Sequence, residues 1–481
     1  MTKKDWDEAL NGLDPDLVEE YVANLDACPR KRSTRPYWFA AVAAVLALAI
    51  GIGALPEWSA SPGTNSSNHL LAKPVYPVMA QYPILANYKD YDSYDRAYVA
   101  WREDQHQQYD QSEGYAASLT DFFQRSMAEF LQGSDNATYS PLNVYMAMAM
   151  LAETTGGNSR QQILDLFGLE TIEQLRDQAS QVWNAHYCAD GQTSLLLANS
   201  LWLDSAYNFK EPTANLLADR YFASSFHGDL NTDEMNQLLH TWLNENTGNL
   251  LEEQAQNVNF NPRTVFALAS TIHFTASWVD EFDSEDTKDS IFHSPEGDRT
   301  VPFMNRFLLD AFYWGEHFTA VRLQLTGNNR MWLILPDEGY TVADVLESGE
   351  YLQMTLDPGS WENVKRYGIN LSLPKFDVSH QENLVDGMKA LGLTDIFNSA
   401  VSNFTPLTDT PELYVSTINH AARVAIDEQG CVGAAFTVIM VEAGFAPNDP
   451  DEIDFTLDRP FLFVVSSRDN LPLFAGIVNE P

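Results

Sequence analysis

Apolar residues recur at three- and four-residue steps soon after residue 114. The set is Leu119, Phe122, Phe123, Met127, Phe130 and Leu131. This spacing predicts an amphipathic helix, and the small and polar residues 133–136 end it. The run 142–151 is apolar on nearly all sides, so we expect a second, buried helix there. A third helix is predicted over 93–109.

Strand patterns dominate the later part of the chain. Alternating or continuous runs of β-favouring residues occupy 194–203, 264–274, 331–335, 371–376 and 461–465. Early helices followed by many strands predict an α+β domain over residues 114–481. No internal repeat is apparent.

The segment 37–55 is a 19-residue run without a charge. As a helix it would span roughly 28 Å, close to the thickness of a bilayer core. The basic residues just before it are Arg30, Lys31, Arg32 and Arg35. The positive-inside rule therefore predicts a transmembrane helix with residues 1–36 in the cytosol and the rest outside. A cleaved signal peptide is the alternative, although the leader is long and no clear A-x-A site follows.

Three segments flank this run. Residues 1–36 form a cytosolic leader whose apolar spacing suits a short amphipathic helix, either a docking helix or a solubilising segment. Residues 56–68 are small, polar and proline-containing, which predicts a flexible linker. Residues 69–113 are rich in tyrosine and tryptophan, so we expect an ordered extension packed on the main domain.

Charge and motifs exclude several functions. The net charge of −39 argues against nucleic-acid binding, because phosphates would be repelled. No G-x-S-x-G, H-E-x-x-H or glycine-rich phosphate motif occurs, so we expect no catalytic residue, cofactor or metal. Isolated histidines such as His273 and His420 are expected to be structural. Cys28, Cys188 and Cys431 lack C-x-x-C spacing, which favours lone thiols over a disulfide.

The segment 429–441 (QGCVGAAFTVIMV) contains no charged residue and starts with small side chains. Alone, it predicts a strand buried on both faces. The residues that follow, 442–452, are acidic and proline-bearing and predict an exposed loop. A central strand with its turn is one explanation of this pair.

Motifs on both sides of that segment carry a family resemblance. They are YSPLN at 139–143, ANSLW at 198–202, TIHFTASW at 271–278, LSLPKF at 371–376, LGLTDIF at 391–397, FTLDRPFLFVV at 455–465 and LFAGIVN at 473–479. In this order they resemble the serpin family of serine protease inhibitors, in a bacterial-type, membrane-anchored arrangement. The resemblance implies a serpin fold with a large central mixed β-sheet, further sheets, about eight or nine helices and an exposed reactive loop.

The resemblance also implies roles for individual residues. The hinge of the reactive loop would comprise Glu428, Gly430, Cys431, Val432, Gly433, Ala434, Ala435, Phe436 and Thr437. The reactive bond would be Gly444–Phe445, to within about three residues. The residues beneath the loop and at its entry, the shutter and breach regions, would be Ser140, Asn199, Trp278 and His420.

The hinge chemistry suits insertion of the loop into the sheet. Alternation would turn one set of uncharged side chains to one face, namely Cys431, Gly433, Ala435, Thr437 and Ile439. Fifteen inserted residues would move an attached protease on the order of 50 Å. The sequence departs from common inhibitory relatives at Cys431, Gly433 and Phe436, where Thr, Ser or Val and then Ala are usual.

These observations predict a suicide-substrate inhibitor rather than an enzyme. The small residues at the bond favour an elastase- or subtilisin-like target, or a chymotrypsin-like one if Phe445 sets specificity. A non-inhibitory serpin acting as a surface binding module is the main alternative, and a transmembrane signalling protein with a serpin sensor is another. The expected partners are a serine protease, bound covalently by a monomer, and the cell membrane. The serpin domain would be extracellular, or secreted if 37–55 is cleaved.

Overall fold

The computed structural model describes residues 69–431 and 451–481, which belong to one compact unit. The predicted membrane segment, the linker, the reactive bond and the hinge residues after Cys431 lie outside the described residues. No helix in the described ranges is long and apolar enough to cross a bilayer.

The two early helices lie where the apolar spacing predicts them. The first, α5 (Leu119–Phe130), buries its apolar face. The second, α6 (Pro141–Thr154), begins with Pro141 at its first position, and the Ser140 hydroxyl accepts a hydrogen bond from the Asn143 N–H (3.4 Å). Nearly every α6 residue is buried, so this helix lies in the centre of the domain.

Eight further helices follow in the described part of the domain. They are α7 (Gly157–Leu166), α8 (Ile172–His186), α9 (Glu211–Tyr221), α10 (Asp233–Asn246), α11 (Glu252–Gln256), α12 (Val342–Ser348), α13 (Glu350–Leu356) and α14 (Val385–Ala390). With α5 and α6 they total ten, close to the expected number, and the last four of this list are short.

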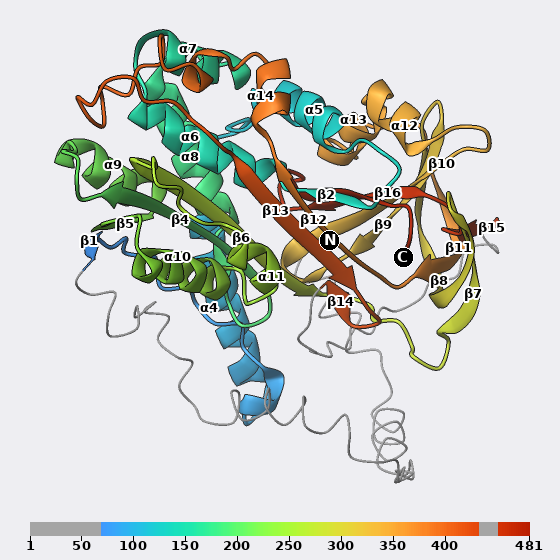
Figure 1. The fold of residues 1–481 in the computed structure, drawn as a ribbon. Coiled ribbons are helices and arrows are strands. Elements are labelled where there is room, and N and C mark those ends of the chain that lie inside the picture. Colours follow the sequence, from blue (N-terminus) through green and yellow to red (C-terminus); the bar gives the residue numbers. More distant parts are fainter. Residues whose placement is uncertain (1–68, 432–450) are drawn as a thin grey trace. The chain divides into compact units, whose positions relative to one another are not determined.

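An eight-stranded mixed sheet runs through one part of the domain (Figure 1). Its order is β1-β5-β4-β6-β14-β13-β12, with β3 paired to β4. The strands are β1 (Leu70–Ala72), β3 (Cys188–Ala189), β4 (Ser194–Asp204), β5 (Ala223–Gly228), β6 (Phe266–Ser277), β12 (Phe376–Asn383), β13 (Asn419–Ile426) and β14 (Gly430–Cys431). Helices α10 and α11 cover one face of β4 and β6, and α6 packs on the other.

A nine-stranded sheet supplies most of the remaining core. Its order is β15-β11-β8-β9-β10-β16-β17-β2, with β7 paired to β8. The strands are β2 (Ala137–Tyr139), β7 (Lys288–Ser294), β8 (Gly297–Trp314), β9 (Phe318–Gln324), β10 (Arg330–Pro336), β11 (Val364–Pro374), β15 (Glu452–Thr456), β16 (Phe461–Ser466) and β17 (Pro472–Val478). Every residue of β16 and β17 is buried, as their continuous apolar sequences require.

The aromatic segment before the domain packs on it. Strand β1 extends the eight-stranded sheet beside β5, and the Tyr76 ring stacks on Trp183, Tyr187 and Phe222. Helix α4 (Tyr91–Tyr109) begins two residues before the predicted position, because Asp90 caps it by accepting a bond from the Ser93 N–H (2.8 Å).

The predicted strands at 194–203, 264–274, 331–335 and 461–465 correspond to β4, β6, β10 and β16. The prediction of one strand over 371–376 needs correction. Strand β11 ends at Pro374, and β12 starts at Phe376 in the other sheet. Between them, the Lys375 backbone N–H donates to the Pro302 carbonyl oxygen. Proline cannot donate to a ladder, so the chain changes sheets at this point.

Candidate functional site

The candidate site lies between strands β6 and β13 of the eight-stranded sheet. These two strands are joined only at one end, by the two-residue strand β14, among the residues that the structure describes. From Phe266 to Thr275, β6 has β4 as its described ladder partner, while β13 pairs with β12 along its whole length. The edge of β6 that faces β13, and the edge of β13 that faces β6, therefore have backbone groups without a ladder partner among the described residues.

A cavity of about 540 Å³ occupies this region. Its lining includes Ala269 and Thr271 of β6 and Asn419 and Ala421 of β13, together with residues of α6, α10 and α11. The first five residues of β6 are only half-buried, although the strand lies inside the sheet. An additional strand would cover them.

Strand β14 occupies the start of this space, and its fit is close. Gly430 pairs with Ser277 and Cys431 with Ala276, while Cys431 also faces Ile426 of β13. A Cβ at position 430 would collide with the Ala276 carbonyl oxygen and lie 2.7 Å from the Ser277 Cα. Only glycine fits there, which explains the glycine at this position.

The turn before β14 is held by hydrogen bonds. The Trp278 indole N–H donates to the Asp427 carbonyl oxygen (2.8 Å), and the Trp278 backbone N–H donates to the Gln429 carbonyl oxygen (2.9 Å). The Asp427 carboxylate accepts from the backbone N–H groups of Gln429 (2.9 Å) and Gly430 (3.2 Å). Trp278 therefore positions the residues that enter the sheet.

Glu428 forms an ion pair beside this turn. Its carboxylate accepts from Lys375 Nζ (2.8 Å) and from the Thr287 hydroxyl (2.8 Å). Burial opposes the charge, but these hydrogen bonds outweigh it and lower the pKa of Glu428 below its usual value. Lys375 lies between β11 of one sheet and β12 of the other, and its contact with Glu428 holds the turn before β14.

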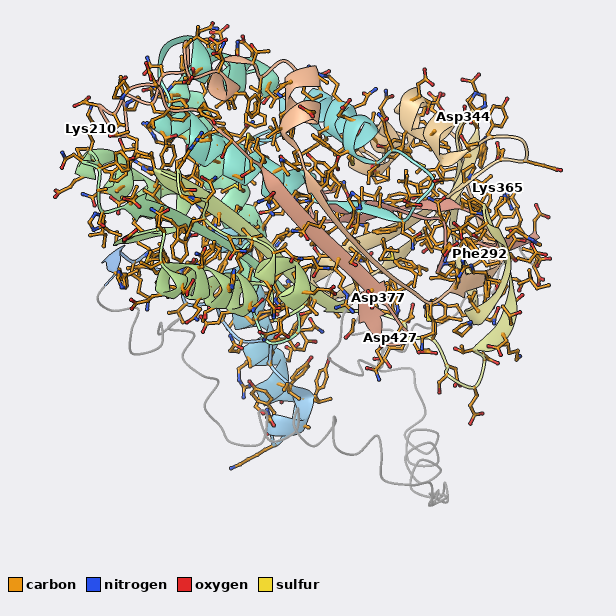
Figure 2. All side chains as sticks on the ribbon, viewed as in Figure 1. Lys210, Phe292, Asp344, Lys365, Asp377 and Asp427 are labelled. Carbon is orange, nitrogen blue, oxygen red and sulfur yellow. The ribbon has the colours of Figure 1, made fainter. Side chains whose placement is uncertain are left out.

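We call the space between β6 and β13 the slot. A second ion pair joins β12 and β13 near the end of the slot where β14 lies. Both Arg423 Nε and Nη2 donate to the Asp377 carboxylate, at 2.8 and 2.6 Å. Asp377 and Asp427 both lie near the β14 end of β13 (Figure 2). This bidentate pair ties β13 to β12, and Arg423 Nη1 also donates to the Leu250 carbonyl oxygen (3.1 Å), just before α11.

A buried polar group lies beneath the slot at the start of α6. The Ser140 backbone N–H donates to His420 Nε2 (3.1 Å), and its hydroxyl donates to the Leu473 carbonyl oxygen (2.6 Å). The Asn143 carboxamide oxygen accepts from the Ser270 hydroxyl (2.7 Å). One helix start thus contacts β6 through Ser270, β13 through His420 and β17 through Leu473.

His420 is buried and packs edge-on against the Tyr139 ring (5.2 Å between centroids). Burial, assisted by nearby His380, lowers the pKa of His420 to about 4. The imidazole is therefore neutral at pH 7 and its Nε2 can accept the Ser140 bond. The structural role expected for His420 agrees with these contacts.

Asn199 lies apart from that polar group. It is on β4 opposite Ser270, and its side-chain amide donates to the Tyr221 carbonyl oxygen (2.7 Å). The four predicted residues beneath the loop thus divide: Ser140 and His420 touch, Trp278 lies at the β14 end, and Asn199 contacts α9. Asn143, Ser270, Lys375 and Asp427 were missed, because their contacts join segments distant in sequence.

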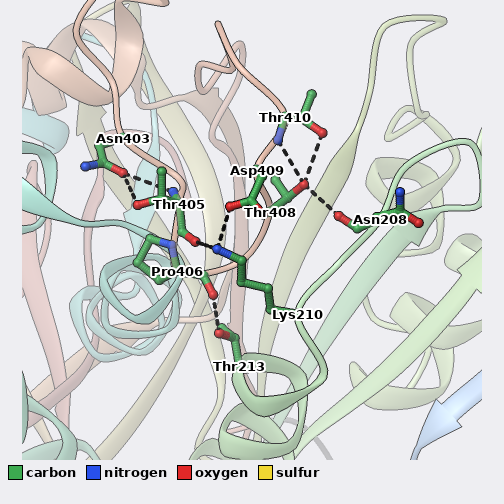
Figure 3. A network of polar contacts seen from close by, with 9 residues as sticks. All are labelled: Asn208, Lys210, Thr213, Asn403, Thr405, Pro406, Thr408, Asp409 and Thr410. Atoms are coloured by element: carbon green, nitrogen blue, oxygen red, sulfur yellow. Dashed lines mark hydrogen bonds and ion pairs between the residues drawn. The ribbon is translucent and has the colours of Figure 1, made fainter.

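The long connection that leads into β13 is fixed at the far end of the slot (Figure 3). Lys210 Nζ donates to the Thr405 carbonyl oxygen (2.6 Å) and to Asp409 Oδ1 (2.6 Å), and the Thr213 hydroxyl donates to the Pro406 carbonyl oxygen. The start of α9 therefore anchors the segment that approaches β13.

Both described cysteines are buried with free thiols, and burial raises the pKa of Cys188 and of Cys431 to about 12. The lone-thiol interpretation holds for these two residues. Among the described residues, no group of three or more His, Cys, Asp or Glu side chains is placed to hold a metal ion.

Comparison with known proteins assigns this architecture. The family model "Serpin (serine protease inhibitor)" matches residues 117–481. The chain belongs to the serpin family. Similar serpins include Serpin-ZX of Arabidopsis thaliana, 27% identical over 368 residues (72% of this chain and 93% of the relative), and human neuroserpin, 26% identical over 362 residues (72% and 86%).

Solved serpin structures share this fold. The native, stressed conformation of Arabidopsis AtSerpin1 matches with a TM-score of 0.65 and 25% identity, covering 77% of this chain and all of the other. The thermophilic serpin tengpin in its native state matches with a TM-score of 0.67 and 24% identity (77% and 95%). A complex of thyroxine-binding globulin with thyroxine matches with a TM-score of 0.63 and 20% identity (76% and 98%).

Proposed function

We propose that this serpin inhibits a serine protease by a suicide-substrate mechanism. The protease serine would attack the Gly444 carbonyl carbon, the Phe445 amine would leave, and an ester would join Gly444 to the protease. The loop from Val432 onward would then enter the slot between β6 and β13 as a new strand. The attached protease would be carried along the sheet and distorted.

The register of β14 is the observation that carries this proposal. Cys431 pairs with Ala276, and in an antiparallel ladder each further residue opposes one residue earlier in β6. Val441 would therefore oppose Phe266, the first residue of β6. The uncharged run ends at Val441 and Glu442 follows. The uncharged run thus has the length of the free edge of β6.

The same register pairs small residues with large ones. Gly433 would oppose Phe274 and Ala435 would oppose Ile272, on the face that belongs to the main core. On the α10 face, Val438 would oppose Ala269 and Met440 would oppose Ala267. Alternation of large and small side chains favours close packing of a new strand.

Phe436, which departs from the family pattern, fits this arrangement. It would oppose Thr271 on the α10 face, where the cavity lies and where the neighbouring β6 side chains are Ala269 and His273. A phenylalanine there fills space instead of overpacking the core. The departure therefore does not oppose insertion.

The residues around the proposed bond favour two classes of target. Ala443, Gly444 and Ala446 are small and suit the shallow pocket of an elastase- or subtilisin-like protease, whereas Phe445 suits a chymotrypsin-like one. No Lys or Arg lies between Arg423 and Arg459, so a trypsin-like target is disfavoured.

The test uses the full chain in detergent with elastase, subtilisin and chymotrypsin. We expect a covalent complex that survives boiling in SDS. Gly433→Arg should be cleaved at the same bond without forming the complex, because a charge would enter the core. Asn448→Arg, beyond the slot register, is the matched control and should still form it. Cleavage of the parent with no complex for all three proteases would sink the inhibitor proposal.

That outcome would favour a binding module instead. One similar structure is a thyroxine-binding globulin with its ligand, so the serpin fold serves binding as well. The departure at Cys431, where inhibitory relatives commonly have Thr, Ser or Val, is the sequence feature that favours this second candidate. It predicts cleavage of the loop without a rise in thermal stability.

We further propose that residues 37–55 anchor the chain in a cell membrane with the serpin domain outside. The support is the uncharged run and the four basic residues before it. Resistance to alkaline carbonate extraction, with protease access to the serpin domain on intact cells, is expected. Recovery in the soluble medium would favour the cleaved signal peptide, and altered signalling after deletion of residues 1–30 would favour the sensor alternative.

A further inference from the structure

Two large apolar side chains lie in solvent on the outer face of the nine-stranded sheet. Phe307 and Leu309 of β8 are 56% and 43% exposed, while Leu308 between them is buried. Strand alternation thus points both outward on the same face. Along this stretch, β11 is the described ladder partner of β8. Large apolar side chains exposed side by side on one face of a sheet are a sign of an interaction surface.

The neighbouring strands make this face flat. Gly368 of β11 lies opposite Leu309, and Glu452 of β15 lies next to Gly368. A Cβ on Gly368 would lie 2.8 Å from the Phe307 Cζ and 3.2 Å from the Glu452 Cγ. The Phe307 ring therefore lies across the glycine, so β8 and β11 present a small apolar patch with no depression at Gly368, and the polar residues of β11 and β15 border it.

The rim of this face carries more acidic than basic side chains. Arg366 is a basic member and donates to the Leu309 carbonyl oxygen (3.3 Å). Glu452 and Asp454 are exposed on β15, and Asp454 accepts a hydrogen bond from the Asn370 amide (2.9 Å). Asp451 pairs with Lys365 Nζ (2.7 Å), a residue marked in Figure 2. The sequence 424–458 contains eight Asp or Glu and no Lys or Arg. A basic partner surface would complement it.

We propose that Phe307, Leu309, Gly368, Glu452 and Asp454 form an accessory docking surface for a serine protease that is basic around its active-site cleft. This inference rests on the proposed function for the reactive bond. Only six residues separate Phe445 from Glu452, so the two residues are at most about 25 Å apart even in an extended chain. A protease that holds the bond in its cleft must therefore lie close to this face.

The charge of the chain argues against a second copy as the occupant. A net charge of −39 opposes self-association through an acidic face. The face is also flat, which does not suit a small molecule, since small molecules bind in concave sites. A protease surface with basic side chains around an apolar patch satisfies both the shape and the charge.

The test measures the encounter separately from the covalent step. The full chain is titrated with a basic pancreatic elastase and with an acidic subtilisin, each as the active enzyme and with its catalytic serine replaced by alanine. Phe307→Ser with Leu309→Ser should weaken binding of the inactive elastase roughly tenfold or more, because a central apolar contact is lost. Val401→Ser with Tyr340→Ser, at exposed apolar positions elsewhere, is the control and should bind as the parent does.

The acidic rim has its own variant. Glu452→Gln with Asp454→Asn should slow association with the basic elastase by roughly three- to tenfold at low salt and flatten its salt dependence. The acidic subtilisin should show neither effect. Once bound, the fraction of active protease that ends in the covalent complex should be unchanged in both double variants.

The outcomes separate this inference from the proposed function. Loss of binding in the patch variants supports the docking surface even if the parent forms no covalent complex, in which case only the inhibitory mechanism fails. Parent-like binding and association in both double variants overturn the docking surface, whether or not the covalent complex forms.

Discussion

The two β-sheets of this serpin differ in how completely their interior strands are paired. In the nine-stranded sheet, β10 pairs with β9 along its length and with β16 over five residues, and β16 pairs with β17. In the eight-stranded sheet, β6 and β13 meet only through the two residues of β14 among the described residues. Strands β10 and β16 are thus paired on both edges, whereas β6 and β13 keep free ladder positions among the described residues. Under the proposed mechanism, the added strand would therefore enter between β6 and β13 and not beside β10 or β16.

The difference in pairing between the two sheets should have its largest effect on the rates of amide hydrogen exchange. We expect the β6 amides that face the slot to exchange roughly a thousandfold or more faster than those of β10 and β16, because the latter exchange only on global unfolding. Mass spectrometry of peptides from β6 and β16 measures the ratio. Cleavage of the reactive loop should then protect the β6 amides, and equal protection of both strands before cleavage would contradict the difference between the sheets.

Matched leucine truncations provide the next largest contrast. Leu462→Ala on fully buried β16 should cost about 3–5 kcal/mol in the free energy of unfolding, because it leaves a cavity. Leu268→Ala on half-buried β6 should cost only about 1 kcal/mol, because its site is partly open. Urea unfolding compares the two variants. Equal losses would show that the slot packs as tightly as the core.

His420 should make the eight-stranded sheet sensitive to acid. Its pKa is lowered from 6.5 to about 4, so the native state binds fewer protons than the unfolded chain. This stabilisation is full above pH 6.5 and falls as the pH drops to about 4, by roughly 3 kcal/mol. Urea unfolding at pH 7 and pH 4.5 measures it. His420→Gln should lose this part of the pH dependence, and an unchanged slope in the variant would refute it.

The smallest expected effect concerns the ion pair at the β14 end. Lys375→Ala should cost about 1 kcal/mol at pH 7, since both partners are partly buried. The pKa of Glu428 is lowered in the native state, so this stabilisation exists above pH 4.5 and is lost as the pH falls through the native pKa.

Lys389→Ala is the control for that variant, because its partner Asp386 is exposed and the loss should be close to zero. Both variants can be compared with the parent by urea unfolding at pH 7 and pH 3. A Lys375 effect that persists at pH 3 would mean that packing of the lysine, not its charge, supports the turn.

Local sequence patterns predicted the helices and most strands, but not the slot between β6 and β13. The apolar spacing from Leu119 to Leu131 and the buried run in α6 depend on neighbours three or four residues away, so they can be seen in the sequence. The slot depends on β6 lying next to β13, about 150 residues later, with only the short strand β14 between them, and a local sequence pattern does not indicate such a long-range arrangement. The strand prediction over 371–376 failed because Pro374 separates two sheets.

At the candidate site, too, some residues could be named from the sequence and others could not. The family resemblance named Ser140, Trp278 and His420, and their roles remain predictions. In the structure, Ser140 contacts His420, and Trp278 contacts the turn before β14. Their partners Asp427, Asn143 and Ser270 are ordinary polar residues whose importance comes from three-dimensional neighbours alone. The hinge residues after Cys431 and the reactive bond remain predictions, since they lie outside the described residues.

The close pairing of Gly430 with β6 has a consequence for the rate of loop insertion. Forming the first pairs of a new ordered segment is the costly step, whereas each later residue adds its bonds to an existing end. Because Gly430 and Cys431 already pair with β6, a released loop would have to extend a ladder and would not have to start one. Under the proposed mechanism, extension would compete with hydrolysis of the acyl ester. Pairs formed before cleavage would shorten the time needed for insertion and so favour the inserted product.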